Sequence, residues 1–134
     1  MSESNFDIDM PFVGHLGLRL LEKRDGTARV AFDPKPEHFN SWNAIHGGAV
    51  MTLLDVALSS ACRALDEACV GCVTVEMKVN FIAAAKGPVV AEAHAQRAGR
   101  SLLFSEGEVR DASGVTVAKA VGTFKLIYPS GAKE

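Results

Sequence analysis

The stretch that decides the fold spans residues 40–63 and reads NSWNAIHGGAVMTLLDVALSSACR. Asp55 is the one formal charge between positions 45 and 62, and the apolar residues there fall on every side of a helix. A helix that is apolar on every side is typically buried on every side. The stretch therefore predicts a central helix from about residue 46 to residue 65, with a carboxylate in its middle.

Length and composition indicate one domain that covers residues 1–134. A chain of 134 residues is long enough to bury a core but short for two domains. With 48% apolar and 22% charged residues, it has the composition of a folded, soluble protein. The net charge of -2 comes with no basic run that would follow a nucleic acid backbone. Because there is neither a signal-peptide pattern nor an apolar run of membrane-spanning length, we expect a cytoplasmic protein without nucleic acid or membrane partners.

Cysteines and histidines do not point to a metal or another cofactor. Of the three cysteines, only Cys69 and Cys72 lie close together, and nothing nearby completes a zinc or redox motif. The four histidines lack the spacing of metal ligands. We therefore expect structural free thiols, no metal and no cofactor.

The rest of the chain favours strands. Residues 16–33 alternate apolar and polar side chains around Asp25-Gly26, which is a hairpin signal. Four further segments favour strands, namely 72–83, 87–99, 101–112 and 115–128. Short turns between successive strands predict an antiparallel meander. The expected fold class is α+β, with a curved antiparallel sheet of five to six strands wrapped round one long helix.

This sheet needs one solvated face and covered edges. The face that carries Glu92, His94 and Gln96 is polar enough to meet water. Free strand edges attract other strands, and pairing with a second chain would cover them.

Asp55 has a structural and a functional interpretation. In the structural one, Thr52 and Ser59, at i−3 and i+4 on the same helix face, hydrogen-bond the carboxylate. In the functional one, Asp55 works with Gly47 and Gly48 at the start of the helix. Glycines there let a ligand approach unpaired amides and the positive end of the helix dipole, a suitable place for a developing oxyanion.

The spacing of these residues indicates a site shared by two chains. Gly47 and Asp55 are eight residues apart, which corresponds to roughly 12 Å along one helix. A reacting carbon has to lie within about 3 Å of both the oxyanion donor and the base or nucleophile. If two chains pack these helices antiparallel, the start of one helix faces the middle of the other. The expected protein partner is a second copy of the chain.

With these residues the chain resembles the hotdog-fold acyl-CoA thioesterases of the phenylacetate-pathway (PaaI-like) type. The resemblance extends from about residue 16 to residue 127. It rests on Asn40, His46-Gly47-Gly48 and Asp55 at their relative spacing, and on the segment TVEMKVNF at residues 74–81.

The resemblance implies a hydrolase that cleaves short-chain, medium-chain or aromatic acyl-CoA to the free acid and CoA. It implies a dimer with a continuous sheet and shared active sites, often doubled into a tetramer, and residues 1–15 as an amino-terminal cap segment. The site residues that it implies are the Gly47 amide, which polarises the thioester carbonyl; Asn40 and His46, which shape the same end of the site; Asp55 of the second chain, which supplies the carboxylate; and Thr74, whose hydroxyl helps to hold the attacking water. The carboxylate acts either as general base or as nucleophile, and both possibilities stay open.

Binding residues are expected beyond this catalytic set. Arg97, Arg100 and Ser101 lie around a turn where relatives often meet the nucleotide end of CoA, although charged hairpin turns are commonly just solvated. Gly48 joins them as a substrate-binding residue. Candidates for the wall of the acyl pocket, each with an alternative role in the core, are Phe12, Trp42, Met51, Leu54 and Phe81.

Two other functions remain open. A non-catalytic acyl-CoA-binding hotdog protein would keep the fold and the CoA groove, but it would have no need of a water-activating acid. A hotdog dehydratase acting on hydroxyacyl thioesters usually pairs a histidine with a helical acid. The spacing of His38 or His46 from Asp55 differs from that signature, so this function ranks lower.

Overall fold

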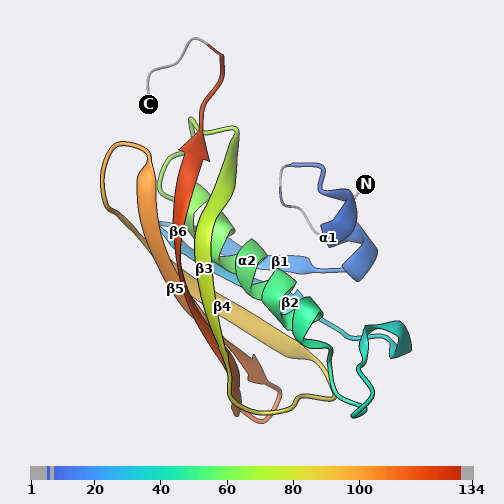
Figure 1. Cartoon of the computed structure of the whole chain (residues 1–134). Coiled ribbons are helices and arrows are strands. Elements are labelled where there is room, and N and C mark those ends of the chain that lie inside the picture. The colour runs from blue at the N-terminus through green and yellow to red at the C-terminus, as the bar shows by residue number, and fades with distance from the viewer. Residues whose placement is uncertain (1–5, 7, 131–134) are drawn as a thin grey trace.

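The structure, a computed structural model, describes Phe6 and residues 8–130. Residues 1–5 and 7 of the expected amino-terminal cap lie outside the described part. In chain order the elements are α1 (Pro11–Leu16), β1 (Arg19–Arg24), β2 (Thr27–Phe32), a 3-10 turn (Pro36–His38), α2 (Gly47–Arg63), β3 (Gly71–Phe81), β4 (Val89–Arg97), β5 (Leu102–Asp111) and β6 (Thr116–Ile127) (Figure 1). One long helix against a six-stranded antiparallel sheet confirms the predicted α+β hotdog fold.

Local sequence signals place the first hairpin and the later strands. Asp25 and Gly26 both have positive φ angles, of 51° and 77°, as a two-residue type I′ hairpin turn requires. The turn joins β1 to β2, whose Arg24 and Thr27 pair directly across it. The four later strands fall within the four predicted segments, apart from one residue at the start of β3.

The strand order differs from the expected meander. The sheet runs β1-β2-β4-β5-β6-β3, so β3 lies at an edge and pairs with β6 rather than with β4. The pairing extends from Gly71 opposite Ile127 to Phe81 opposite Ala118, because β3 and β6 are the two longest strands and match in length. The meander prediction holds for β4, β5 and β6, which pair in sequence. It was wrong for β3, because short connections do not determine which distant strand offers a matching partner.

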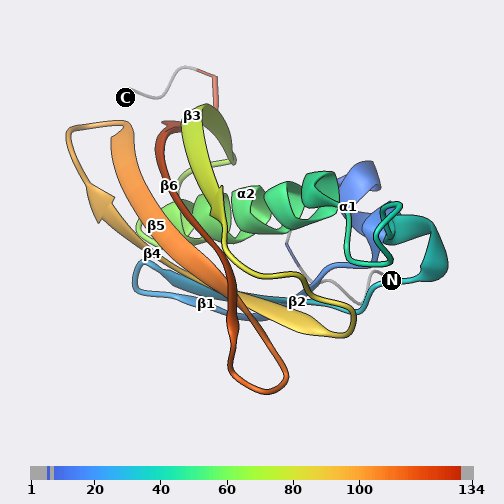
Figure 2. The same cartoon turned by 60° about the horizontal axis from the view of Figure 1, so that its bottom comes forward.

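The core lies between α2 and the concave side of the sheet, which curves round the helix (Figure 2). Leu53, Leu54 and Leu58 of α2 are fully buried there. The expectation that α2 is buried on every side was wrong, because Met51 is 41% exposed and Asp55 is only partly buried. One stripe of the helix therefore remains open along the side that the sheet does not cover.

The β4 residues on the opposite face of the sheet are polar, as expected. Glu92, His94 and Gln96 of β4 are all exposed, and Glu92 lies 3.8 Å from Arg29 of β2. Within the described ranges, no helix has both the length and the apolar character needed to span a membrane.

Candidate active site

The start of α2 leaves one amide free. His46 caps the helix, and its Nδ1 accepts a hydrogen bond from the Gly48 amide at 2.8 Å. The amides of Ala49 and Val50 both donate to the His46 carbonyl. Among the described residues, none accepts a hydrogen bond from the Gly47 amide. Of the two predicted glycines, Gly47 is therefore the one whose N–H can bind a ligand.

The cap also fixes the tautomer of His46. Because Nδ1 accepts a hydrogen bond, the neutral ring carries its proton on Nε2. His46 is exposed, so this second N–H is available at the same end of α2. A doubly protonated ring would lose the cap, since Nδ1 could then no longer accept from Gly48.

Asn40 shapes the loop that leads into α2. Its Oδ1 accepts hydrogen bonds from the amides of Trp42 and Ala44, at 2.9 and 3.1 Å. The backbone N–H of Asn40 donates to the Ala44 carbonyl at 2.8 Å, and Asn43 adopts a φ of 60° within the turn. The loop holds Trp42 in an 84% exposed position. Asn40 therefore positions this end of the site through the backbone.

Asp55 meets the predicted hydroxyl of β3. The Thr74 Oγ1–H donates to Oδ1 of Asp55 across the gap between α2 and β3. Thr52 and Ser59 instead donate to backbone carbonyls one turn earlier in α2, at 2.8 and 3.2 Å. The structural interpretation, in which these two hydroxyls hold the carboxylate, was wrong. The open stripe of α2 gives Asp55 access to solvent.

Arg97 belongs to a clamp between three segments. Its guanidinium lies 3.6 Å from Asp66, in the loop after α2, and donates to the carbonyl of Arg100 within the β4–β5 turn. Tyr128, after β6, donates to the same Asp66 carboxylate at 2.6 Å. This hydrogen bond, followed by one from the Ala68 amide, lowers the pKa of Asp66, and it raises the pKa of Tyr128. No local signal in the sequence indicated this clamp, because its members are far apart in the chain.

Arg100 and Ser101, the other predicted residues of this turn, are not part of the ion pair with Asp66. Arg100 is exposed, and the Ser101 carbonyl accepts a hydrogen bond from the Leu126 amide at 3.0 Å. The turn lies near the carboxyl end of α2, next to Asp66, whereas Gly47 begins the helix (Figure 1). Within one chain, the expected CoA-binding turn and the expected oxyanion site therefore lie at opposite ends of α2.

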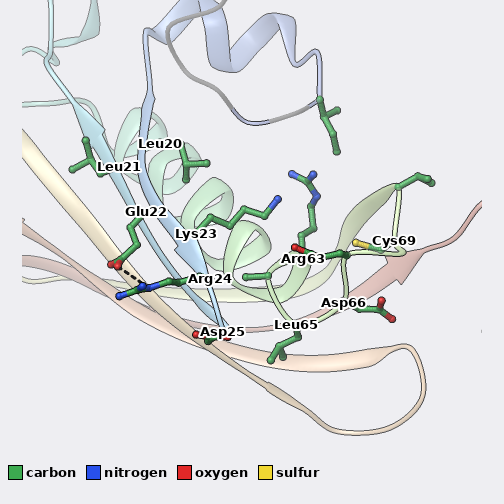
Figure 3. A pocket seen from close by; sticks show the side chains of 14 residues that line it. Leu20, Leu21, Glu22, Lys23, Arg24, Asp25, Arg63, Leu65, Asp66 and Cys69 are labelled. Carbon is green, nitrogen blue, oxygen red and sulfur yellow. Dashed lines mark ion pairs between the residues drawn. The ribbon is translucent and has the colours of Figure 1, made fainter.

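A cleft of about 910 Å³ lies between β1 and the carboxyl end of α2. Lys23 and Arg63 extend into it (Figure 3), and Arg63 also donates to the Phe6 carbonyl at 3.1 Å. The residues that line this cleft include neither Asp55 nor Gly47. The candidate site lies instead on the open stripe of α2.

Cys62 of α2 and Cys72 of β3 pack against each other. Cys62 is fully buried, and a hydrogen bond between its thiol and that of Cys72, followed by burial, raises the pKa of Cys72. A thiol with a raised pKa is a poor nucleophile at neutral pH. In the described part of the chain, no three His, Cys, Asp or Glu side chains gather as metal ligands would.

Comparisons with known proteins agree with this architecture. The family model of the thioesterase superfamily matches residues 43–118 of this chain. A protein from Saccharolobus solfataricus that is named as an esterase is 30% identical over 84% of this chain and 80% of its own length. A conserved protein from Pseudomonas aeruginosa has a solved structure that is 32% identical, with a TM-score of 0.83 over 92% of this chain and 99% of that one. The phenylacetic acid degradation protein PaaI from Thermus thermophilus is 25% identical, with a TM-score of 0.78 over 88% of this chain and 99% of that one. The chain therefore belongs to the thioesterase superfamily, within its PaaI-like hotdog branch.

Proposed function

We propose that the protein is an acyl-CoA thioesterase that hydrolyses short-chain, medium-chain or aromatic acyl-CoA to the free acid and CoA. The observation that carries the proposal is the hydrogen bond from Thr74 to Asp55, on a helix whose first amide, that of Gly47, is unpaired. A carboxylate held by a hydroxyl and a free helix amide are the two groups that thioester hydrolysis needs. A relative from Salmonella typhimurium, 24% identical over 90% of this chain and 88% of its own length, is named as a medium/long-chain acyl-CoA thioesterase.

Each group has a role in the reaction. The thioester carbonyl oxygen accepts from the Gly47 amide, where the helix dipole stabilises the negative charge that develops on it. Thr74 holds Oδ1 of Asp55 and leaves Oδ2 to take a proton from water. Water then adds to the carbonyl carbon, and the C–S bond breaks to release the CoA thiolate. Alternatively, Oδ2 adds to the carbonyl carbon, the C–S bond breaks to release the CoA thiolate, and water then cleaves the resulting anhydride.

Two chains are needed because Gly47 and Asp55 lie roughly 12 Å apart along α2. In an antiparallel pair of helices, the register that sets Gly47 opposite Asp55 also sets Met51, midway between them, opposite itself. Met51 would then lie on the two-fold axis, which gives its exposed side chain a partner. The free edge of β3 lies beside the same stripe and offers a seam between the two sheets. Two such dimers can associate into a tetramer without changing this site.

The same antiparallel arrangement suits CoA. It brings the carboxyl end of α2 in one chain towards the start of α2 in the other. The β4–β5 turn of one chain, with Arg100 and Ser101, is thereby brought towards the oxyanion site formed by the second chain. We propose that this turn receives the nucleotide end of CoA, with Arg100 as its phosphate contact, because Arg97 is engaged by Asp66.

A thioester panel read by thiol release tests the proposal. Asp55→Asn keeps the shape of the side chain and removes the base, so we expect turnover of the best acyl-CoA to fall by about 10²- to 10⁴-fold. The variant should keep its fold and its dimer. Near wild-type turnover by such a variant would refute the role of Asp55. Binding of CoA with no thiol release from any thioester would instead identify a non-catalytic binder, and an enoyl product would identify a dehydratase.

A further inference from the structure

Phe81 stands beside the open start of α2. It ends β3 and pairs with Ala118 of β6, and the next two amides, of Ile82 and Ala83, both donate to the Val117 carbonyl. The sheet therefore holds the backbone of Phe81 in place. Even so, the residue is 55% exposed. An anchored aromatic ring that faces solvent offers a rigid apolar surface to a ligand.

The ring lies against the first residue of the helix. A Cβ added to Gly47 would be 3.5 Å from both Cε1 and Cζ of Phe81, which is ordinary van der Waals contact. The ring edge thus flanks the residue whose amide is free. A carbonyl oxygen bound there lies about 2.9 Å from the Gly47 nitrogen, which brings a group on the carbonyl carbon within reach of the ring.

Met51 continues the apolar stripe of α2 towards the two-fold axis of the proposed dimer, where it packs on its own copy. It follows Gly47 by one helical turn on the same face of α2 and is 41% exposed. Leu54, another of the wall candidates, is fully buried and belongs to the core. The pantetheine and nucleotide parts of CoA carry amides and phosphates, whereas an acyl chain is apolar. The exposed ring of Phe81 therefore matches the acyl side of the thioester.

We propose that Phe81 is a specificity-determining residue that packs on the first carbons of the acyl group, next to the thioester carbonyl. The inference rests on the proposed function. A ring at this position limits the width available beside the carbonyl, so it favours an unbranched carbon there. Replacing the ring by a smaller side chain opens that space to a methyl branch.

The test compares two substrates, the best acyl-CoA of the panel and its derivative with a methyl group on the carbon next to the carbonyl. In Phe81→Ala, the kcat/KM of the branched substrate relative to the unbranched one should rise about tenfold, since a pocket discriminates a methyl group by this order. Phe81→Trp should lower the same ratio. Ile82→Ala is the matched control, because Ile82 is equally exposed and adjacent in sequence, and it should leave the ratio unchanged.

Two further measurements keep the test decisive. Phe81→Leu should give a smaller shift in the same direction and carries the test if the alanine variant unfolds. The shift should persist when both acyl groups are carried on N-acetylcysteamine, because the ring contacts the acyl part. A ratio that stays within about twofold in all Phe81 variants, or a shift that disappears with the short thiol, would overturn the inference alone. A wild-type protein that hydrolyses no thioester would overturn the proposed function and the inference with it.

Discussion

Replacing Gly47 by proline removes the one N–H on which the proposed oxyanion site depends. Proline is favoured at the first position of a helix, where its missing N–H breaks no helical hydrogen bond. The residue before proline has to be extended, and His46 already has φ −57° and ψ 137°. The sequence and backbone around position 47 therefore allow Gly47→Pro to fold with α2 intact.

The expected loss of activity in Gly47→Pro is that caused by removing one oxyanion donor. Loss of such a donor lowers kcat by about 10²- to 10³-fold, or about 2.7 to 4 kcal/mol of transition-state stabilisation. Gly47→Ala is the matched control, because it keeps the N–H and adds a Cβ that meets the Phe81 ring at an ordinary distance of 3.5 Å. The alanine variant should therefore stay within about tenfold of wild-type kcat, since it retains the donor.

The assay is release of CoA thiol from the best acyl-CoA, with the melting temperature and the mass in solution measured alongside. The reasoning is refuted if Gly47→Pro is folded, keeps the wild-type oligomeric state and turns over within about threefold of wild type, because the site would then work without its donor. It is also refuted if the alanine variant loses as much activity as the proline variant, because the loss would then follow the added carbon and not the missing N–H.

Three further predictions follow from named contacts. Thr74→Val removes the hydroxyl that holds Asp55, so kcat should fall by about tenfold to a hundredfold while Thr74→Ser stays near wild type; equal losses in both variants would contradict the contact. Arg100→Glu should raise the KM of the CoA thioester and leave an N-acetylcysteamine thioester unaffected, and equal effects on both would discard Arg100 as a phosphate contact. Tyr128→Phe removes the hydrogen bond that lowers the pKa of Asp66 and raises that of Tyr128. In wild type, the stability from this bond is lost when acid protonates Asp66 and when alkali deprotonates Tyr128, so the variant lacks it at every pH. The difference in melting temperature between wild type and Tyr128→Phe should be widest from about pH 5 to pH 9 and narrow on either side, and a constant difference would contradict the clamp.

Local signals in the sequence were sufficient for the elements. Asp25-Gly26 predicted the first turn because two residues with positive φ are what a tight hairpin needs. The run after His46 predicted α2 to within two residues at its carboxyl end. Burial of this helix on every side was not realised, because one chain covers only the sides of α2 that face its own sheet.

The strand order could not be predicted from local signals in the sequence. Pairing of β3 with β6 joins residues far apart in the chain, from Gly71 with Ile127 to Phe81 with Ala118, and nothing within β3 specifies that partner over β4. The clamp of Asp66, Arg97 and Tyr128 was not predicted for the same reason, because it forms only when three distant segments come together in the fold. Arg97, an expected CoA contact, takes part in this clamp through its ion pair with Asp66.

The candidate site was partly predictable. The glycines and the lone carboxylate could be recognised from residue type and spacing. Thr74 came from the family resemblance, as a group that helps to hold the attacking water, and in the structure its hydroxyl donates to Asp55. Which glycine amide is free depended on the direction of the His46 ring, and a sequence does not contain that information. The sequence likewise did not show which candidates for the acyl-pocket wall belong to the core. The structure distinguishes them, because Leu54 is buried and Phe81 lies against Gly47.

Subunit complementation tests the central claim, that Gly47 of one chain and Asp55 of another form one site. Gly47→Pro and Asp55→Asn, each expected to be at least about a hundredfold less active alone, are refolded together as an equal mixture. Half of the dimers are then mixed, and each mixed dimer contains one site with both wild-type groups, so the mixture should regain about a quarter of wild-type activity. If both groups acted within a single chain, every site would lack one of them, and a mixture with no activity above its two parents would contradict the account.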